Sequence, residues 1–183
     1  MAYSSGFNPH PRISYANAAP TGAASEAEYV ELGLSQVCDP DKVREALNEV
    51  LPAGFEIVAL AEAKPASLTD LLQASDWEMQ LPDAGADELK RAAEQLMATE
   101  EFMVERMTKT GMRTFDVRAA LLGLAVEADR VGLRVVHQTP LVRPDDVRSA
   151  LRAIAPGIPD TPPVLRRIRQ GPLDGGQIRD PLD

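Results

Sequence analysis

The chain has 183 residues, 44% of them hydrophobic, and a formal net charge of -9. A chain of that length and composition is expected to fold as one large domain or two small ones around an apolar core. Its acidic balance argues against indiscriminate binding to nucleic acid, because contacts with phosphates need clustered Lys and Arg.

The composition also excludes several kinds of site. Cys38 is the one cysteine and there are two histidines, so neither an internal disulfide nor a Cys/His zinc cluster can form. We expect Cys38 to be a small buried residue beside a helix cap. No run approaches the roughly 18 apolar residues of a membrane helix, and the polar start is no secretory signal. We therefore expect no metal, no cofactor and no membrane partner, and a cytoplasmic location.

The first distinctive string is residues 3–12, which read Tyr-Ser-Ser-Gly-Phe-Asn-Pro-His-Pro-Arg. Two prolines fix φ on either side of His10, and the glycine permits a backbone that other residues do not tolerate. The string predicts a stiff loop that presents His10 and Arg12. His10, flanked by Asn8, could act as a general base with Arg12 as an adjacent anion binder. A turn in which Asn8 and His10 only satisfy backbone groups is the alternative.

Hydrophobic periodicity predicts the elements of the first half in chain order. We expect strands near 12–16 and over 29–34, the second with alternate apolar residues on one face. A short amphipathic helix begins at Pro40, because proline at a first helical position followed by an acid is a helix start. A strand over 54–61 follows. Glu26 and Glu28 share a strand face and are expected to be solvated.

The second half can be predicted in the same way. Strands are expected over 76–81, 102–107, 133–138 and 164–168, with a hairpin or extra strand within 114–126. Helices are expected over 87–97 and from Pro144. Residues 143–151 repeat the Pro, Asp, Val, Arg, Ala and Leu of 39–47 at an offset of 104, and both helices lie between strands.

This repeat predicts an α+β fold of tandem ferredoxin-like (βαββαβ) halves. Residues 1–75 form the first half (ββαβ plus a linker helix), 76–170 the complete second half with an inserted hairpin, and 171–183 a disordered tail. Because the first half lacks its opening strand and helix, we expect Met1 not to be the natural start. We also expect the apolar residues of 30–34 or 55–57 to be more exposed than those of 133–136.

Other candidate residues carry charge. Arg113 and Arg118, with Lys109, form one possible phosphate-binding cluster, and Arg169, with Arg166 and Arg167, forms another; a solvated face is the alternative for each. Asp116 and Arg118 lie two residues apart and share a strand face, as a catalytic or a structural ion pair. His137, in an apolar strand, is expected to be a satisfied core or edge residue.

Several segments of the chain resemble a known bacterial protein family. The matching segments are residues 2–14, 20–22, 25–29, 47–48, 51–54, 67–68 and 116–118, and the Gly-Phe-Asn-Pro-His-Pro string is the most specific of them. They are similar to the radical-SAM-linked protein family, a bacterial domain of unknown function found beside or fused to B12-binding-type radical-SAM proteins. In some genomes its genes lie near those of ribonuclease E/G and ribosomal proteins. Members of that family carry a further strand and helix before the segment that corresponds to residues 2–14 of this chain.

The resemblance implies a radical-SAM protein as the partner and RNA as a possible ligand. The chain has no Cys-x-x-x-Cys-x-x-Cys, so it cannot itself hold a radical-SAM cluster. One hypothesis is an accessory or binding module whose contacts are Asn8, His10, Arg12, Arg113, Arg118 and Arg169. The other is a metal-independent RNA-processing enzyme with His10 as general base and Asp116 as a second candidate, which rests on fold analogy. The low aromatic content, 4%, argues against a base-stacking platform.

Overall fold

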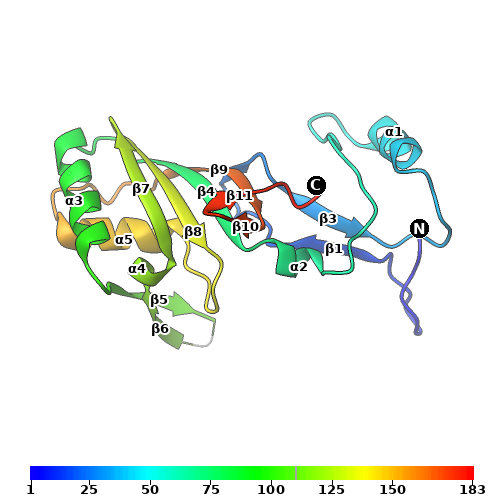
Figure 1. Ribbon diagram of the computed structural model, residues 1–183, viewed down its shortest axis with the longest axis horizontal. Helices are drawn as coiled ribbons and strands as arrows, with labels where there is room; N and C mark the ends of the chain where they lie inside the picture. The colour runs from blue at the N-terminus through cyan, green and yellow to red at the C-terminus, as the bar shows by residue number, and fades with distance from the viewer. Residues whose placement is uncertain (110) are drawn as a thin grey trace.

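The structure is a computed structural model that describes residues 1–109 and 111–183, and it is a mixed α+β fold. Figure 1 shows an elongated molecule, with the larger sheet and most helices at one end and β1, β3 and α1 at the other. The elements of the first part are β1 (Ile13–Ala16), β2 (Ala24–Ser25), β3 (Tyr29–Leu32), α1 (Pro40–Val50) and α2 (Leu68–Leu71). Those of the second part are β4 (Ala74–Gln80), α3 (Ala86–Ala98), β5 (Met103–Thr108), β6 (Gly111–Asp116), α4 (Val117–Ala120), β7 (Leu121–Glu127), β8 (Arg130–Val136), α5 (Pro144–Ile154), β9 (Val164–Gly171), β10 (Leu173–Asp174) and β11 (Gln177–Ile178).

The main sheet has five strands in the order β2-β9-β4-β8-β7, with β2 parallel to β9 and the other neighbours antiparallel. In β4, Trp77 and Met79 are buried while Asp76 and Glu78 are partly exposed, so one face of the sheet is the core face. The apolar stripes of α3 and α5 pack in the same core cluster. The strands and helices predicted for residues 76–108 and 133–168 are confirmed, with small shifts at their ends.

The inserted hairpin is β5 paired with β6, and an ion pair ties it to α5. Arg106 of β5 bonds to Asp146 in the first turn of α5, and its guanidinium lies 4.1 Å from the centroid of the Phe115 ring. The prediction for residues 114–126 was incomplete, because that stretch contains the end of β6, the short helix α4 and the start of β7.

The two look-alike helices lie in unlike surroundings. Both α1 and α5 have 11 residues and start at proline, as predicted. However, α5 buries Val147, Ala150 and Leu151, whereas α1 has no buried residue. The strand predicted over 54–61 is wrong, since those residues form no regular element. The Asn48 side chain instead bonds both backbone groups of Ile57, at 2.7 and 3.1 Å. A tandem duplication is therefore not confirmed.

Apolar residues in the first part are more exposed than those of the sheet, as expected. Leu34 is 38% and Phe55 67% exposed, against 3% for Leu133 and 1% for Val135. Cys38, predicted to be buried, is exposed. The small core of this part contains Ala16, Leu68 and Leu72 with Tyr29 packed against them, and it is separate from the core of the sheet.

Residues 171–183, predicted to be disordered, pack against the sheet. The β10–β11 hairpin buries Ile178, and Pro181 is buried after it. A Cβ built on Gly171 would lie 2.0 Å from the Arg179 carbonyl oxygen, so only glycine allows this close approach. No helix in the described residues is long and apolar enough to cross a membrane.

Candidate functional site

The N-terminal string forms a closed loop, as its composition predicted. Tyr3 and Pro11 form an isolated bridge, the Ser4 amide donates to the His10 carbonyl at 2.9 Å, and the His10 amide donates to Ser4 Oγ at 3.0 Å. Gly6, at the turn, has a φ of 131°, which favours glycine. The His10 side chain is exposed, as are its neighbours Asn8 and Arg12.

The predicted site residues occupy separate places. Figure 1 shows the loop at one end of the molecule and α4 toward the other. Asp116 caps α4, where its Oδ1 accepts from the amides of Phe102 at 3.1 Å and Ala119 at 3.2 Å. Arg118 donates to the carbonyls of Met97 and Leu121, at 3.2 and 3.1 Å. These are structural contacts. Arg113 is exposed on β6, and Arg169 pairs with Asp76 at 3.4 Å on the main sheet.

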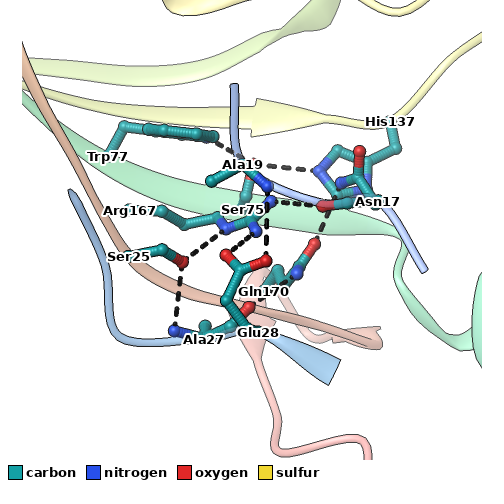
Figure 2. A network of polar contacts seen from close by, with 10 residues as sticks. All are labelled: Asn17, Ala19, Ser25, Ala27, Glu28, Ser75, Trp77, His137, Arg167 and Gln170. Atoms are coloured by element: carbon teal, nitrogen blue, oxygen red, sulfur yellow. Dashed lines mark hydrogen bonds and ion pairs between the residues drawn. The ribbon is translucent and has the colours of Figure 1, made fainter. Parts of the chain in front are cut away.

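A buried polar network, which the sequence did not predict, joins the segment before β3 to the main sheet (Figure 2). At its centre is Arg167 of β9, whose side chain is 1% exposed. Arg167 pairs with Glu28 and donates to Asn17 O at 2.7 Å and to Ser25 Oγ at 3.2 Å. Its guanidinium also lies 5.2 Å from the centroid of the Trp77 ring. Glu28, predicted to be solvated, is thus the partner of a buried cation.

One sequence signal could have found Arg167. In β9, Leu165 and Arg167 are two residues apart and share a strand face, so an apolar Leu165 places Arg167 toward the core. A charged side chain on a core face requires a partner of opposite charge. The partner, however, is 139 residues away in the chain, and no local pattern identifies it.

The second group in the network is His137, which is satisfied as predicted. Its Nδ1 lies 2.6 Å from Leu72 O and its Nε2 2.9 Å from Ser75 Oγ. Burial, with a smaller contribution from Arg167, lowers the pKa of His137 and favours the neutral ring. A carbonyl only accepts, so Nδ1 carries the proton and Nε2 accepts from the Ser75 hydroxyl.

A serine hydroxyl bonded to a neutral imidazole is the arrangement of an activated nucleophile. Here the pair is buried, because Ser75 is 1% exposed and its Oγ also accepts from Trp77 Nε1 at 2.8 Å. Neither of the two best-defined hollows in the described residues is lined by Ser75 or His137. The network is therefore a structural connection between the two parts of the molecule.

A hollow with a volume of about 600 Å³ lies between β3, α1, residues 56–64 and the C-terminal residues. Val30 and Leu32 of β3 line it, and so do Val43 and Leu47 of the apolar stripe of α1. Pro181 and Leu182 contribute from the C-terminus. These walls are mostly apolar. The α1 side chains that line the hollow are not buried, because no residue of α1 is buried.

Acidic side chains predominate among the charged groups of this hollow. Glu31, Glu56, Glu62 and Asp180 line it together with Lys64, whose Nζ donates to the Asp183 carbonyl. Tyr29 also lines it; burial and the neighbouring Asp180 carboxylate raise the pKa of Tyr29 to about 12. The lining of the hollow therefore combines many apolar side chains with charged groups that are mostly acidic.

Metal ligation has no obvious place in the part of the chain that the structure describes. No group of three or more His, Cys, Asp or Glu side chains there could hold an ion.

Comparison with known proteins identifies a family. The model of a family described as "Uncharacterized protein conserved in bacteria (DUF2344)" matches residues 1–146, and the chain belongs to that family. No curated protein and no solved structure matches the chain.

Proposed function

We propose that this member of a conserved bacterial family is a binding module that docks onto a partner protein through the hollow beside α1. The observation that carries the proposal is the uncovered apolar stripe of α1 facing an unfilled apolar hollow of about 600 Å³. Exposed apolar surface of this kind marks interaction sites in soluble proteins, because leaving it in water costs free energy.

The charges of the hollow limit the kind of partner. Six carboxylates line it against one lysine, and two of the six, Glu26 and Glu28, are paired with arginines of β9. A docking segment with apolar side chains and flanking Lys or Arg complements the remaining acidic groups. The resemblance of residues 2–14 and 116–118 to the radical-SAM-linked family supports a radical-SAM protein as that partner. The chain would then act as its accessory, and RNA modification is the process that the gene neighbourhoods of that family favour.

The fold of the larger part of the molecule also supports a binding role. We interpret β4, α3, β7, β8, α5 and β9 as a ferredoxin-like unit, because a helix follows β4 and β8 and the strand order is β9-β4-β8-β7. Such a unit supplies a scaffold on which the smaller end is held by the Arg167 network.

The alternative, an RNA-processing enzyme with His10 as general base, has less support. A general base needs a proton donor within hydrogen-bond reach and benefits from a group that orients its ring. Among the described residues, no side chain is hydrogen-bonded to the His10 ring, and the other proposed catalytic residue, Asp116, caps α4.

The test is to co-express the chain with the radical-SAM protein of the same genome and to measure their affinity. Leu47→Asp should weaken binding at least about tenfold, because burying a leucine is worth about 1.5–3 kcal/mol. Val50→Asp is the matched control, since Val50 is on the same helix, 77% exposed and outside the lining of the hollow. Neither residue is buried in the free chain, so both variants should unfold at nearly the native temperature. Equal affinities of the two variants would show that the hollow is not the docking site.

A further inference from the structure

One wall of the hollow beside α1 is the free edge of a strand. Within the described residues β3 pairs with β1 alone, and the Gly33 amide just after it donates to the Arg12 carbonyl at 2.7 Å. Backbone groups alternate in direction along a strand, so those of Glu31 also face β1, while those of Val30 and Leu32 point to the other edge. Side chains from both faces of β3 line the hollow, which therefore lies at this edge.

The opposite wall is an extended segment that pairs with no strand. Residues 55–64 contain no turn or bend, and residues 56–64 line the hollow. The backbone of Ile57 is bonded by the Asn48 side chain, which lies outside that lining. In an extended chain the next residue directs its backbone groups to the other side, so those of Val58 point away from Asn48. Among the described residues they have no hydrogen-bond partner.

The sequence repeat indicates which element would fit between these walls. Residues 143–151 repeat 39–47, so α1 corresponds to α5. In the larger part of the molecule, α5 follows β8 and precedes β9, and β4 lies between these two strands. At the smaller end, α1 follows β3 and precedes residues 55–64, and the hollow lies between them. The hollow thus occupies the place that corresponds to β4.

The contacts of β4 show what a strand does at that place. β4 has seven residues and pairs with β8 on one side and β9 on the other. Its Trp77 and Met79 are buried in the same core cluster as Leu151 of α5. Without such a strand the equivalent residue of α1, Leu47, lines the hollow and is not buried. One missing strand therefore accounts for the free edge of β3, the unpaired segment and the uncovered helix.

We propose that the partner docks by inserting one of its own β-strands between β3 and residues 56–61. This inference rests on the proposed function, because it takes the hollow as the docking site. The inserted strand bonds the free backbone groups of Val30 and Leu32 and packs its alternate apolar side chains against Val43 and Leu47. In strand addition, main-chain hydrogen bonds give affinity and the alternate side chains give specificity.

The charges favour a strand from a partner over one from a second copy of this chain. The carboxylates of the hollow that are not paired with β9 outnumber its one cation; they are Glu31, Glu56, Glu62 and Asp180, against Lys64. A complementary strand carries Lys or Arg beside its apolar residues. The chain itself has a formal net charge of -9, so a second copy is repelled as a whole.

The first experiment tests the free edge with two substitutions at one position. Val30→Pro removes the amide that points to the hollow, and proline is tolerated on an edge strand when its nitrogen faces away from the ladder. Val30→Ala is the matched control, because it also removes the apolar side chain but keeps the amide. We expect Val30→Pro to bind the radical-SAM protein of the same genome at least about tenfold more weakly than Val30→Ala.

The second experiment uses the native chain and does not depend on the folding of a variant. Amide hydrogen exchange is measured residue by residue, with and without the radical-SAM protein. In the free chain the amides of Val30 and Leu32 should exchange fast and that of Glu31 slowly, because only Glu31 faces β1. Binding should slow the exchange of Val30, Leu32 and Val58 at least about tenfold and change that of Glu31 little.

The outcomes separate this inference from the docking proposal. If Leu47→Asp weakens binding but the amides of Val30 and Leu32 stay unprotected in the complex, the docking site stands and the inserted strand is refuted. Equal affinities of the two Val30 variants would likewise contradict the strand. Protection that rises with the concentration of the chain alone would assign the strand to a second copy. Protection without any partner in a chain begun upstream of Met1 would assign it to this protein itself; either result overturns the partner as its source.

Discussion

Two neighbouring ion pairs allow a test of what holds the smaller end of the molecule to the sheet. Glu26 and Glu28 lie two residues apart and pair with the consecutive residues Arg166 and Arg167. Arg166 is 50% exposed and Arg167 is 1% exposed. We therefore compare Glu26→Ala with Glu28→Ala, which remove the same chemical group from an exposed pair and from a buried one.

The expected costs differ because the guanidinium groups left behind differ in their access to water. Removing one partner of a buried ion pair costs about 3–5 kcal/mol, since the other charge stays desolvated. Glu28 itself is 37% exposed, and Arg167 keeps its bonds to Asn17 O and Ser25 Oγ. We therefore expect a loss near the lower limit, about 3 kcal/mol. For Glu26→Ala we expect about 0.2–1 kcal/mol, the usual worth of an exposed pair.

Urea unfolding at neutral pH measures both free energies, and thermal unfolding gives a second readout. At about 2–4 °C per kcal/mol for a chain of this length, Glu28→Ala should lower the melting temperature by about 6–12 °C and Glu26→Ala by less than about 4 °C. Replacing Arg167 with methionine in the Glu28→Ala background should restore much of the loss, because the unpaired charge is then gone. Equal costs for the two single variants would refute the argument that Arg167 is desolvated and depends on Glu28.

Three further outcomes are expected. Leu151→Ala in α5 should cost about 2–5 kcal/mol of unfolding free energy, whereas the equivalent Leu47→Ala in α1 should cost under about 1 kcal/mol, because only Leu151 is buried. Similar costs in urea unfolding would show that the two helices are packed alike, as a tandem duplication predicts. Because the pKa of His137 is lowered in the folded state, the unfolded chain binds the proton first, and stability should be complete above about pH 6.5 and fall as the pH drops below it. His137→Gln should remove that pH dependence and His10→Gln should keep it; the reverse result would contradict the assignment. Ile178→Ala should cost about 2 kcal/mol or more, whereas a disordered tail predicts no cost at all.

Local patterns were sufficient to predict β4, β8 and β9 of the main sheet and the helices α3 and α5, but not the short strand β2 or the bounds of β7. The alternation in residues 76–81 and the helical spacing in 87–97 gave the correct element type because each element packs against a core on one side. The same patterns failed where no such core exists. Residues 54–61 are apolar enough for a strand, but they pair with no strand, and the Asn48 side chain bonds the backbone of Ile57 instead. Periodicity thus predicts a face to be buried but does not supply the surface that buries it.

The same distinction between local and long-range information applies to the candidate functional residues. The N-terminal loop was identified correctly because Gly6, Pro9 and Pro11 act locally on the backbone. Whether His10 and Asp116 belong to one site depends on contacts between distant segments, and no short-range pattern contains that information. The Arg167 network depends on partners 139 and 150 residues away, which is why only the structure reveals it.

The position of the smaller end is determined by polar contacts more than by apolar packing. The core of the sheet and the small core around Leu68 are separate clusters, so they share no continuous apolar interface. Between them, Glu26 pairs with the exposed Arg166 of β9, and Glu28 pairs with Arg167, which points to the core face. Tyr29, the next residue, begins the strand that lines the hollow. The segment that carries the proposed docking site is thus held to β9 by two carboxylates, by the pairing of β2 with β9, and by the hydrogen bonds of Arg167 to Asn17 and Ser25.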